Sequence, residues 1–147
     1  MNLNKINESR MINIDTRDID ERGQILSLCD NQTNNVSYIK SFRNTIRSNH
    51  YHVTDWHIIY VLRGKMNYFY KKIKSNFVKH LLIKSGQSVF TPVLEIHATH
   101  FESNTELIVM SKNKRDQKNY EKDTKRVKFI TKDNINTYLD KFKNERI

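Results

Sequence analysis

The chain between Val36 and Met110 is a succession of short apolar runs, each bounded by turn residues. The runs are rich in β-branched and aromatic residues, and they read VSYIKSF, HIIYVL, KMNYFYKK, KHLLIK, QSVFTP, EIHATHF and ELIVMS. Short runs of this composition are typical of strands. No helical period separates them, so the sequence predicts an all-β antiparallel sandwich or barrel. The Arg63-Gly64 pair predicts a hairpin turn between two of these strands.

The two ends of the chain differ from this central region. Residues 1–14 show no apolar periodicity, and we expect a flexible arm there, or an edge strand borrowed by a partner chain. Near the C-terminus, apolar side chains recur at helical spacing, at Ile135, Tyr138, Leu139 and Phe142. Asp133 precedes them as a candidate N-cap. The sequence therefore predicts one domain over residues 15–130, followed by a short helix and tail over residues 131–147.

A formal net charge of +10 at pH 7 makes the chain strongly basic. Lys and Arg gather most in residues 111–147, but that segment lacks the interleaved aromatic residues of a platform for single-stranded nucleic acid. Nucleic-acid binding is therefore not the expected function, whereas an anionic small molecule such as a diphosphate fits the charge. No apolar run is long enough to span a membrane and no signal peptide is visible, so we expect a soluble, cytoplasmic protein. The single cysteine, Cys29, excludes an intramolecular disulfide.

Three histidines lie close together in the stretch SNHYHVTDWHIIYVLRG. His50 and His52 are separated by one residue, so on a strand they point to the same face. His57 joins that face only if a bulge or turn in the intervening VTDW segment resets the alternation. His97 comes from a separate strand, after GQSVFTP. Such imidazoles form a candidate site for zinc, iron, nickel or manganese, although histidine pairs on polar strands are also common without a metal.

The spacing of the histidines and of the scarce Gly and Pro residues resembles the two signature motifs of the cupin superfamily. In that family the first motif runs from His-x-His through a Glu to a Gly, and the second runs from a Gly through a Pro to a last His. The matching positions in this chain are His50, His52, His57 and Gly64, then Gly86, Pro92 and His97. The resemblance implies a jelly-roll antiparallel barrel with these histidines in its cavity. It also implies a divalent metal held by His50, His52, His57 and His97.

Three positions depart from the cupin pattern. His57 stands where metal-binding cupins usually have Glu, Phe101 stands where an Asn often follows the last histidine, and Glu95 replaces a common Gly. A metal held by four histidines would have one negative ligand charge fewer than in the usual set.

The sequence around the first motif is similar to that of a narrower group of cupins. Residues 15–127, with DERGQILSL and the RSNHYH stretch, resemble the dTDP-4-dehydrorhamnose 3,5-epimerases and the dTDP-keto-sugar ketoisomerases. RSNHYH is also similar to cupin domains of capsular polysaccharide enzymes. The resemblance implies an isomerase or epimerase of deoxysugar or polysaccharide biosynthesis that acts on a nucleotide-linked keto sugar. In that chemistry His50 or His52 removes a proton next to a carbonyl, because a neutral imidazole is a suitable base near neutral pH.

Other side chains are candidates for binding the substrate. Arg43, Arg47 and Arg63, helped by Lys65, are cations that could hold a diphosphate, although solvated strand residues would look the same. Tyr68 and Tyr70 share a strand face and either line the cavity or belong to the core.

Three further polar residues have simpler expected roles. His100 should face away from His97 and take no part in the site. Asp55 is either a turn residue or the carboxylate partner of a nearby imidazole. By the same resemblance, Asp123 and Arg126 are expected to form a structural pair.

Two other functions remain open at this stage. One is a non-catalytic sugar-binding or regulatory cupin module, and the other is a metal-dependent dioxygenase. Because small cupins often pair through an exchanged N-terminal strand, the resemblance also implies a homodimer.

Overall fold

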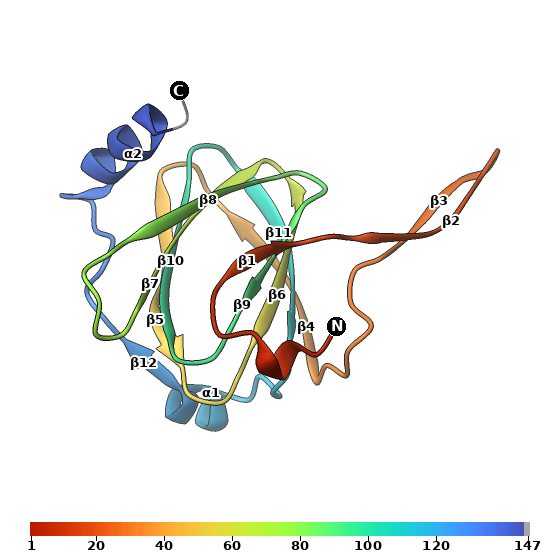
Figure 1. Cartoon of the computed structure of the whole chain (residues 1–147), viewed down its shortest axis with the longest axis horizontal. Coiled ribbons are helices and arrows are strands. Elements are labelled where there is room, and N and C mark those ends of the chain that lie inside the picture. The colour runs from red at the N-terminus through yellow and green to blue at the C-terminus, as the bar shows by residue number, and fades with distance from the viewer. Residues whose placement is uncertain (146–147) are drawn as a thin grey trace.

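The computed structural model describes residues 1–145 and consists mainly of two five-stranded sheets that face each other (Figure 1). Every strand pair is antiparallel. In spatial order, the first sheet contains β1 (Arg10–Ile12), β9 (Ser88–Thr91), β6 (His57–Arg63), β11 (Thr105–Ser111) and β4 (Asn35–Ser41). The second contains β12 (Thr124–Arg126), β5 (Thr45–His52), β10 (Glu95–Phe101), β7 (Lys65–Lys72) and β8 (Lys79–Lys84). The all-β prediction is confirmed.

The main core lies between the two sheets. Along β7, Met66, Tyr68 and Tyr70 point inward, where they meet residues of the opposite sheet such as Val61 and Val109. The shared face expected for the two tyrosines is therefore confirmed, and their ring centroids lie 5.8 Å apart. The alternation of strand side chains thus leaves one face of each sheet for the barrel interior.

The outer face of the second sheet is covered by the C-terminal helix α2 (Ile135–Asn144). Its buried residues Ile135 and Phe142 pack against Phe69 of β7. The predicted helix is confirmed, but its N-cap is Asn134 and not Asp133. Asn134 accepts a hydrogen bond from the Thr131 backbone N–H at 2.8 Å, and this bond shapes the turn that starts the helix. No helix within residues 1–145 is long and apolar enough to cross a membrane.

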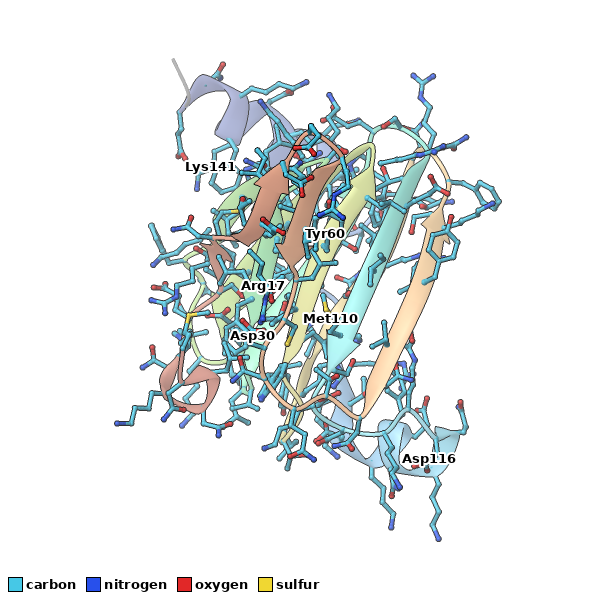
Figure 2. All side chains as sticks on the ribbon, turned by 90° about the vertical axis from the view of Figure 1, so that its right-hand side faces the viewer. Arg17, Asp30, Tyr60, Met110, Asp116 and Lys141 are labelled. Atoms are coloured by element: carbon cyan, nitrogen blue, oxygen red, sulfur yellow. The ribbon has the colours of Figure 1, made fainter. Side chains whose placement is uncertain are left out.

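The N-terminal segment packs on the outer face of the first sheet. The 3-10 helix η1 (Leu3–Lys5) buries Leu3 against Trp56 and Phe90, and β1 pairs with β9 of its own barrel. Figure 2 shows this sheet face-on, with Tyr60 and Met110 on it. Within the described chain the predicted arm therefore contacts its own barrel, and the proposed division into domains stays a prediction.

A two-stranded hairpin of β2 (Asp15–Asp20) and β3 (Gly23–Ser27) projects from the barrel (Figure 1). It pairs with neither large sheet. At its base an ion pair joins Arg17 to Asp30 (Figure 2).

The turn at Gly64 differs from the prediction. β6 and β7 belong to different sheets, so Arg63-Gly64 carries the chain across the end of the barrel and forms no hairpin. The Arg63-Gly64 signal predicted a turn correctly. A short turn does not by itself show whether the two strands that it joins pair with each other or belong to different sheets.

Candidate active site

Four histidines converge inside the barrel. His50 and His52 come from β5, and their ring centroids are 4.6 Å apart. His97 of β10 lies 4.8 Å from His50, which is opposite it in the strand register. His57 opens β6 in the other sheet after the turn at residues 53–56, and its ring lies 4.6 Å from that of His52. The turn thus resets the alternation, as the sequence required for His57 to face inward.

The ring nitrogens form two overlapping groups that could each hold a metal ion. In the first group, nitrogens of His50, His52 and His97 lie within 4.8 Å of one another. In the second, the same limit holds for His52, Asp55 and His57. His57 Nε2 lies 2.9 Å from Asp55 Oδ2, so Asp55 is a carboxylate partner as well as a turn residue.

The two ring nitrogens of His52 differ in their contacts: Nδ1 has polar neighbours, and Nε2 has none. Its Nδ1 lies 3.2 Å from Asp123 Oδ2 and 3.4 Å from Thr124 Oγ1, whereas its buried Nε2 has no hydrogen-bond partner. Asp123 Oδ1 accepts hydrogen bonds from the backbone N–H of Thr54 at 2.7 Å and from its hydroxyl at 2.6 Å. A carboxylate beside Nδ1 favours the tautomer with its proton there, which leaves a lone pair on Nε2.

Burial keeps the imidazoles of His50, His52 and His97 neutral. It lowers the pKa of His50 to about 3, and the charges of His52 and His57 act in the same direction. Burial also lowers the pKa of His52 to about 3, opposed in part by Asp55 and Asp123. The pKa of His97 is well below its ordinary value, again mainly through burial. Neutral imidazoles are the form that accepts protons and binds metals.

A cavity of about 130 Å³ opens beside the histidines. Besides His50, His57 and His97, its lining includes apolar residues of both sheets, Arg47 of β5, and Arg115 and Tyr120. Tyr120 belongs to α1 (Gln117–Asp123) and Arg115 to the loop before it. Within residues 1–145, no Asp or Glu lines this cavity. The cavity is therefore suited to a neutral or anionic ligand.

Of the three arginines predicted to bind the substrate, only Arg47 lies at the cavity. Arg47 lines the cavity, and its guanidinium donates to Ser41 Oγ at 2.8 Å and to the Lys40 carbonyl at 3.1 Å. Arg43 is exposed in the turn before β5. Arg63 forms an ion pair with Glu106, with Nε 3.5 Å from Oε2. Neither of these two lines the cavity.

The two predicted tyrosines lie deeper in the barrel. Tyr68 is fully buried, stacks on His97 at 6.0 Å, and has its hydroxyl 2.8 Å from both Ser9 Oγ and Thr91 Oγ1. Tyr70 is buried beside it. His100 points to the other side of β10, as expected, because its neighbour Ala98 packs with the outer cluster under α2.

The C-terminal part of the site was not found from the sequence. The expected pair of Asp123 and Arg126 is wrong, since Arg126 forms a two-bond pair with Glu121 at 2.7 and 2.9 Å, and Asp123 contacts His52. Arg115 and Tyr120 were not identified either, because no spacing rule links that segment to the barrel strands.

Comparison with solved structures identifies the fold. The chain has the cupin jelly-roll fold, as its two sheets and the convergent motif histidines already indicate. The similar structures include the QdtA 3,4-ketoisomerase from Thermoanaerobacterium thermosaccharolyticum in complex with TDP, at 18% identity and a TM-score of 0.66 over 80% of this chain and 86% of that chain. The WlaRB TDP-quinovose 3,4-ketoisomerase from Campylobacter jejuni matches at 17% identity and a TM-score of 0.66, over 76% of this chain and 90% of that chain.

A longer protein contains the same fold as one part. The capsular polysaccharide assembling protein CapF from Staphylococcus aureus matches at 17% identity and a TM-score of 0.60, over 80% of this chain but 35% of CapF. A scan against models of protein families and a search of curated protein sequences give no match.

Proposed function

We propose that the protein is an isomerase or epimerase that acts on a nucleotide-linked keto sugar. The observation that carries this proposal is a cluster of four buried histidines, three of which, His50, His57 and His97, line a cavity with no carboxylate from residues 1–145. The 3,4-ketoisomerases of the same fold support it, and one QdtA structure contains TDP-4-keto-6-deoxyglucose. We also propose a cytoplasmic location, since the substrate class is a nucleotide sugar.

The chemistry begins with removal of a proton from the carbon next to the sugar's carbonyl. His50, which lines the cavity, takes up this proton, and His52 Nε2, which has no hydrogen-bond partner and whose ring is oriented by Asp123, accepts a proton from His50 in turn. The positive charge that forms on His52 is stabilised by Asp123 and Asp55, both of which raise its pKa. The same proton then returns from His52 through His50, whose ring is 4.6 Å away, to the product, so both imidazoles end neutral.

As an alternative to this proton transfer, the residues fit a divalent metal, which would occupy the Nε2 lone pair that His52 otherwise uses to accept a proton. Three neutral imidazoles, those of His50, His52 and His97, have nitrogens within 4.8 Å of one another, and the orphaned Nε2 of His52 is one of the free donors. Histidine sets of this kind suit zinc, iron or nickel. A bound metal would act as a Lewis acid that polarises the substrate's carbonyl.

The remaining predicted residues keep supporting roles in the proposal. Arg47 contributes positive charge at the cavity, while Tyr68, which stacks on His97, and Tyr70 beside it support that histidine from deeper in the barrel. Arg43 and Arg63 would contact the substrate only outside the cavity.

Proton exchange in heavy water tests the function. TDP-4-keto-6-deoxyglucose should gain deuterium next to the ketone with the wild-type protein, measured by NMR, and His52→Gln should abolish this exchange. His100→Gln is the matched control, because it removes a buried histidine that lies on the other side of β10. Binding of the nucleotide sugar without exchange would instead identify a sugar-binding module.

Elemental mass spectrometry tests the metal. In the metal alternative, metal is near-stoichiometric in the wild-type protein and in His57→Ala, because His57 is already hydrogen-bonded to Asp55, and it is lost in His97→Ala. His100→Ala is the control. Loss of metal in both His57→Ala and His97→Ala would establish a four-histidine site, and metal-free wild-type protein would contradict the metal proposal.

We further propose a homodimer formed through the projecting hairpin. Ile19 of β2 and Ile25 of β3 are 72% and 59% exposed. An isolated two-stranded hairpin is only marginally stable in water, so a second copy of the chain is a suitable cover for these side chains.

A further inference from the structure

The cavity has two cationic side chains on its lining besides its histidines, and they differ in what they already bind. The guanidinium of Arg47 is engaged by Ser41 and by the Lys40 carbonyl. Arg115 is exposed and, within residues 1–145, has no ion pair and no hydrogen bond through its guanidinium. Its Cζ atom lies 4.8 Å from the ring centroid of Tyr120. Arg115 therefore presents a complete set of donors at the edge of the cavity.

The charge of Arg115 also reaches the histidines. Burial and the neighbouring imidazoles are the main causes that lower the pKa of His50, and Arg126 and Arg115 add to them. Arg126 is neutralised by its two-bond pair with Glu121. Arg47 and Arg115 thus line the cavity without a carboxylate partner in the described chain, and of these two only Arg115 has a guanidinium without a hydrogen bond.

The size of the cavity sets where the parts of a nucleotide sugar can lie. About 130 Å³ is well below the roughly 300–1,000 Å³ of pockets that enclose a whole small ligand. A single sugar ring can enter, and the diphosphate attached to it must then lie at the mouth. Building on the function proposed above, we propose that Arg115, placed over the ring of Tyr120, binds the diphosphate of the nucleotide sugar there. A guanidinium matches phosphate oxygens with two parallel hydrogen bonds.

A second basic hollow competes for the same anion. A groove of about 710 Å³ on the other side of α1 is lined by Lys114, Lys122 and Lys125, among others. The groove shares no lining residue with the histidine cavity, and the carboxylate of Asp123 borders it. A diphosphate in the groove would therefore meet a negative charge and would be separated from a sugar beside His50 and His97.

Calorimetric titration with thymidine diphosphate and uridine diphosphate tests this assignment. We expect Arg115→Gln to raise the Kd about 10- to 100-fold, the usual loss for a hydrogen-bonded charged pair. Arg115→Lys should recover only part of the affinity, because an ammonium cannot form the paired contact. Lys122→Gln removes the same charge from the outer groove, and Lys118→Gln removes it from the exposed surface of α1. Both should bind as the wild-type protein does.

The outcomes separate this inference from the proposed function. An unchanged Kd in Arg115→Gln, or weaker binding in Lys122→Gln alone, would overturn the role of Arg115 while leaving the isomerase proposal intact. Diphosphate binding that depends on Arg115, without proton exchange in the keto sugar, would keep this inference and contradict the isomerase. Absence of diphosphate binding by the wild-type protein would overturn the inference outright. The unfolding midpoint of each variant is measured alongside, and we expect no change for a side chain this exposed.

Discussion

At the scale of single residues, the environment of His52 leads to a specific prediction about Asp123. Asp123→Asn keeps the size and the acceptor for Thr54 but removes the charge beside His52 Nδ1. We expect the rate of proton exchange to fall about 10- to 100-fold with little change in KM, the usual cost of losing a carboxylate behind a functional histidine. Asp133→Asn, the same change at an exposed position before α2, is the control. A full exchange rate in a folded Asp123→Asn protein would refute this role.

The inward residues that the sequence predicted share one property: they belong to regular strands. His50, His52 and His97 follow from strand alternation and motif spacing, and the structure brings them together. Both Arg115 and Asp123 come after the last long strand. Arg115 lies in the loop before the seven-residue helix α1, and Asp123 is the last residue of that helix. Their position depends on how that segment folds back over the barrel, which no local periodicity encodes.

At the scale of elements, the crossing between the sheets depends on Gly64. Its φ is +84°, and an added Cβ would lie 2.6 Å from Thr105 Oγ1 and 2.8 Å from the Asn104 carbonyl oxygen. Gly64→Ala should therefore lower the free energy of unfolding by about 2–4 kcal/mol, through both backbone strain and overlap. Gly86→Ala is a close control, because φ is also +84° there but no atom lies within 4 Å of the added Cβ. Gly86→Ala should lower the free energy of unfolding by only about 1 kcal/mol. Equal losses in urea unfolding would show that the contact with Thr105 is unimportant.

The elements themselves were more predictable than their pairing. The apolar runs correspond to strands and the C-terminal repeat corresponds to α2, because burial on one face imposes a local period. The sheet to which a strand belongs depends on long-range contacts, so the turn at Arg63-Gly64 was misread as a hairpin. The short helix α1 has no buried residue, and a helix without an apolar face leaves no periodic signal.

At the scale of the whole molecule, the buried histidines make stability depend on pH. The folded state lowers the pKa of His50 and of His52 to about 3, whereas the unfolded chain protonates them near their ordinary value of about 6.5. The stabilisation is complete above that value and is lost as the pH falls towards 3, because the unfolded state then binds more protons. At about pH 5 one such histidine lowers the free energy of unfolding by about 2 kcal/mol.

Thermal unfolding of the metal-free protein measures this loss. Between about pH 7.5 and about pH 5, the Tm should fall by about 4–8 °C for each histidine that behaves this way. His52→Gln should show a smaller fall, since glutamine does not titrate. A Tm that does not change over this range would contradict the neutral state of the cluster.

The hairpin of β2 and β3 offers a test of assembly. If a second copy covers it, charges placed at its exposed isoleucines should be expelled from the interface at a cost of several kcal/mol. Ile19→Asp combined with Ile25→Asp should convert a dimer to a monomer in light scattering, while Phe42→Ser, at a turn residue that is 70% exposed, should leave the dimer intact. A monomeric wild-type protein would remove the proposal. Since the histidine cavity is lined within a single chain, the monomeric variant should also retain proton exchange, which would separate assembly from catalysis.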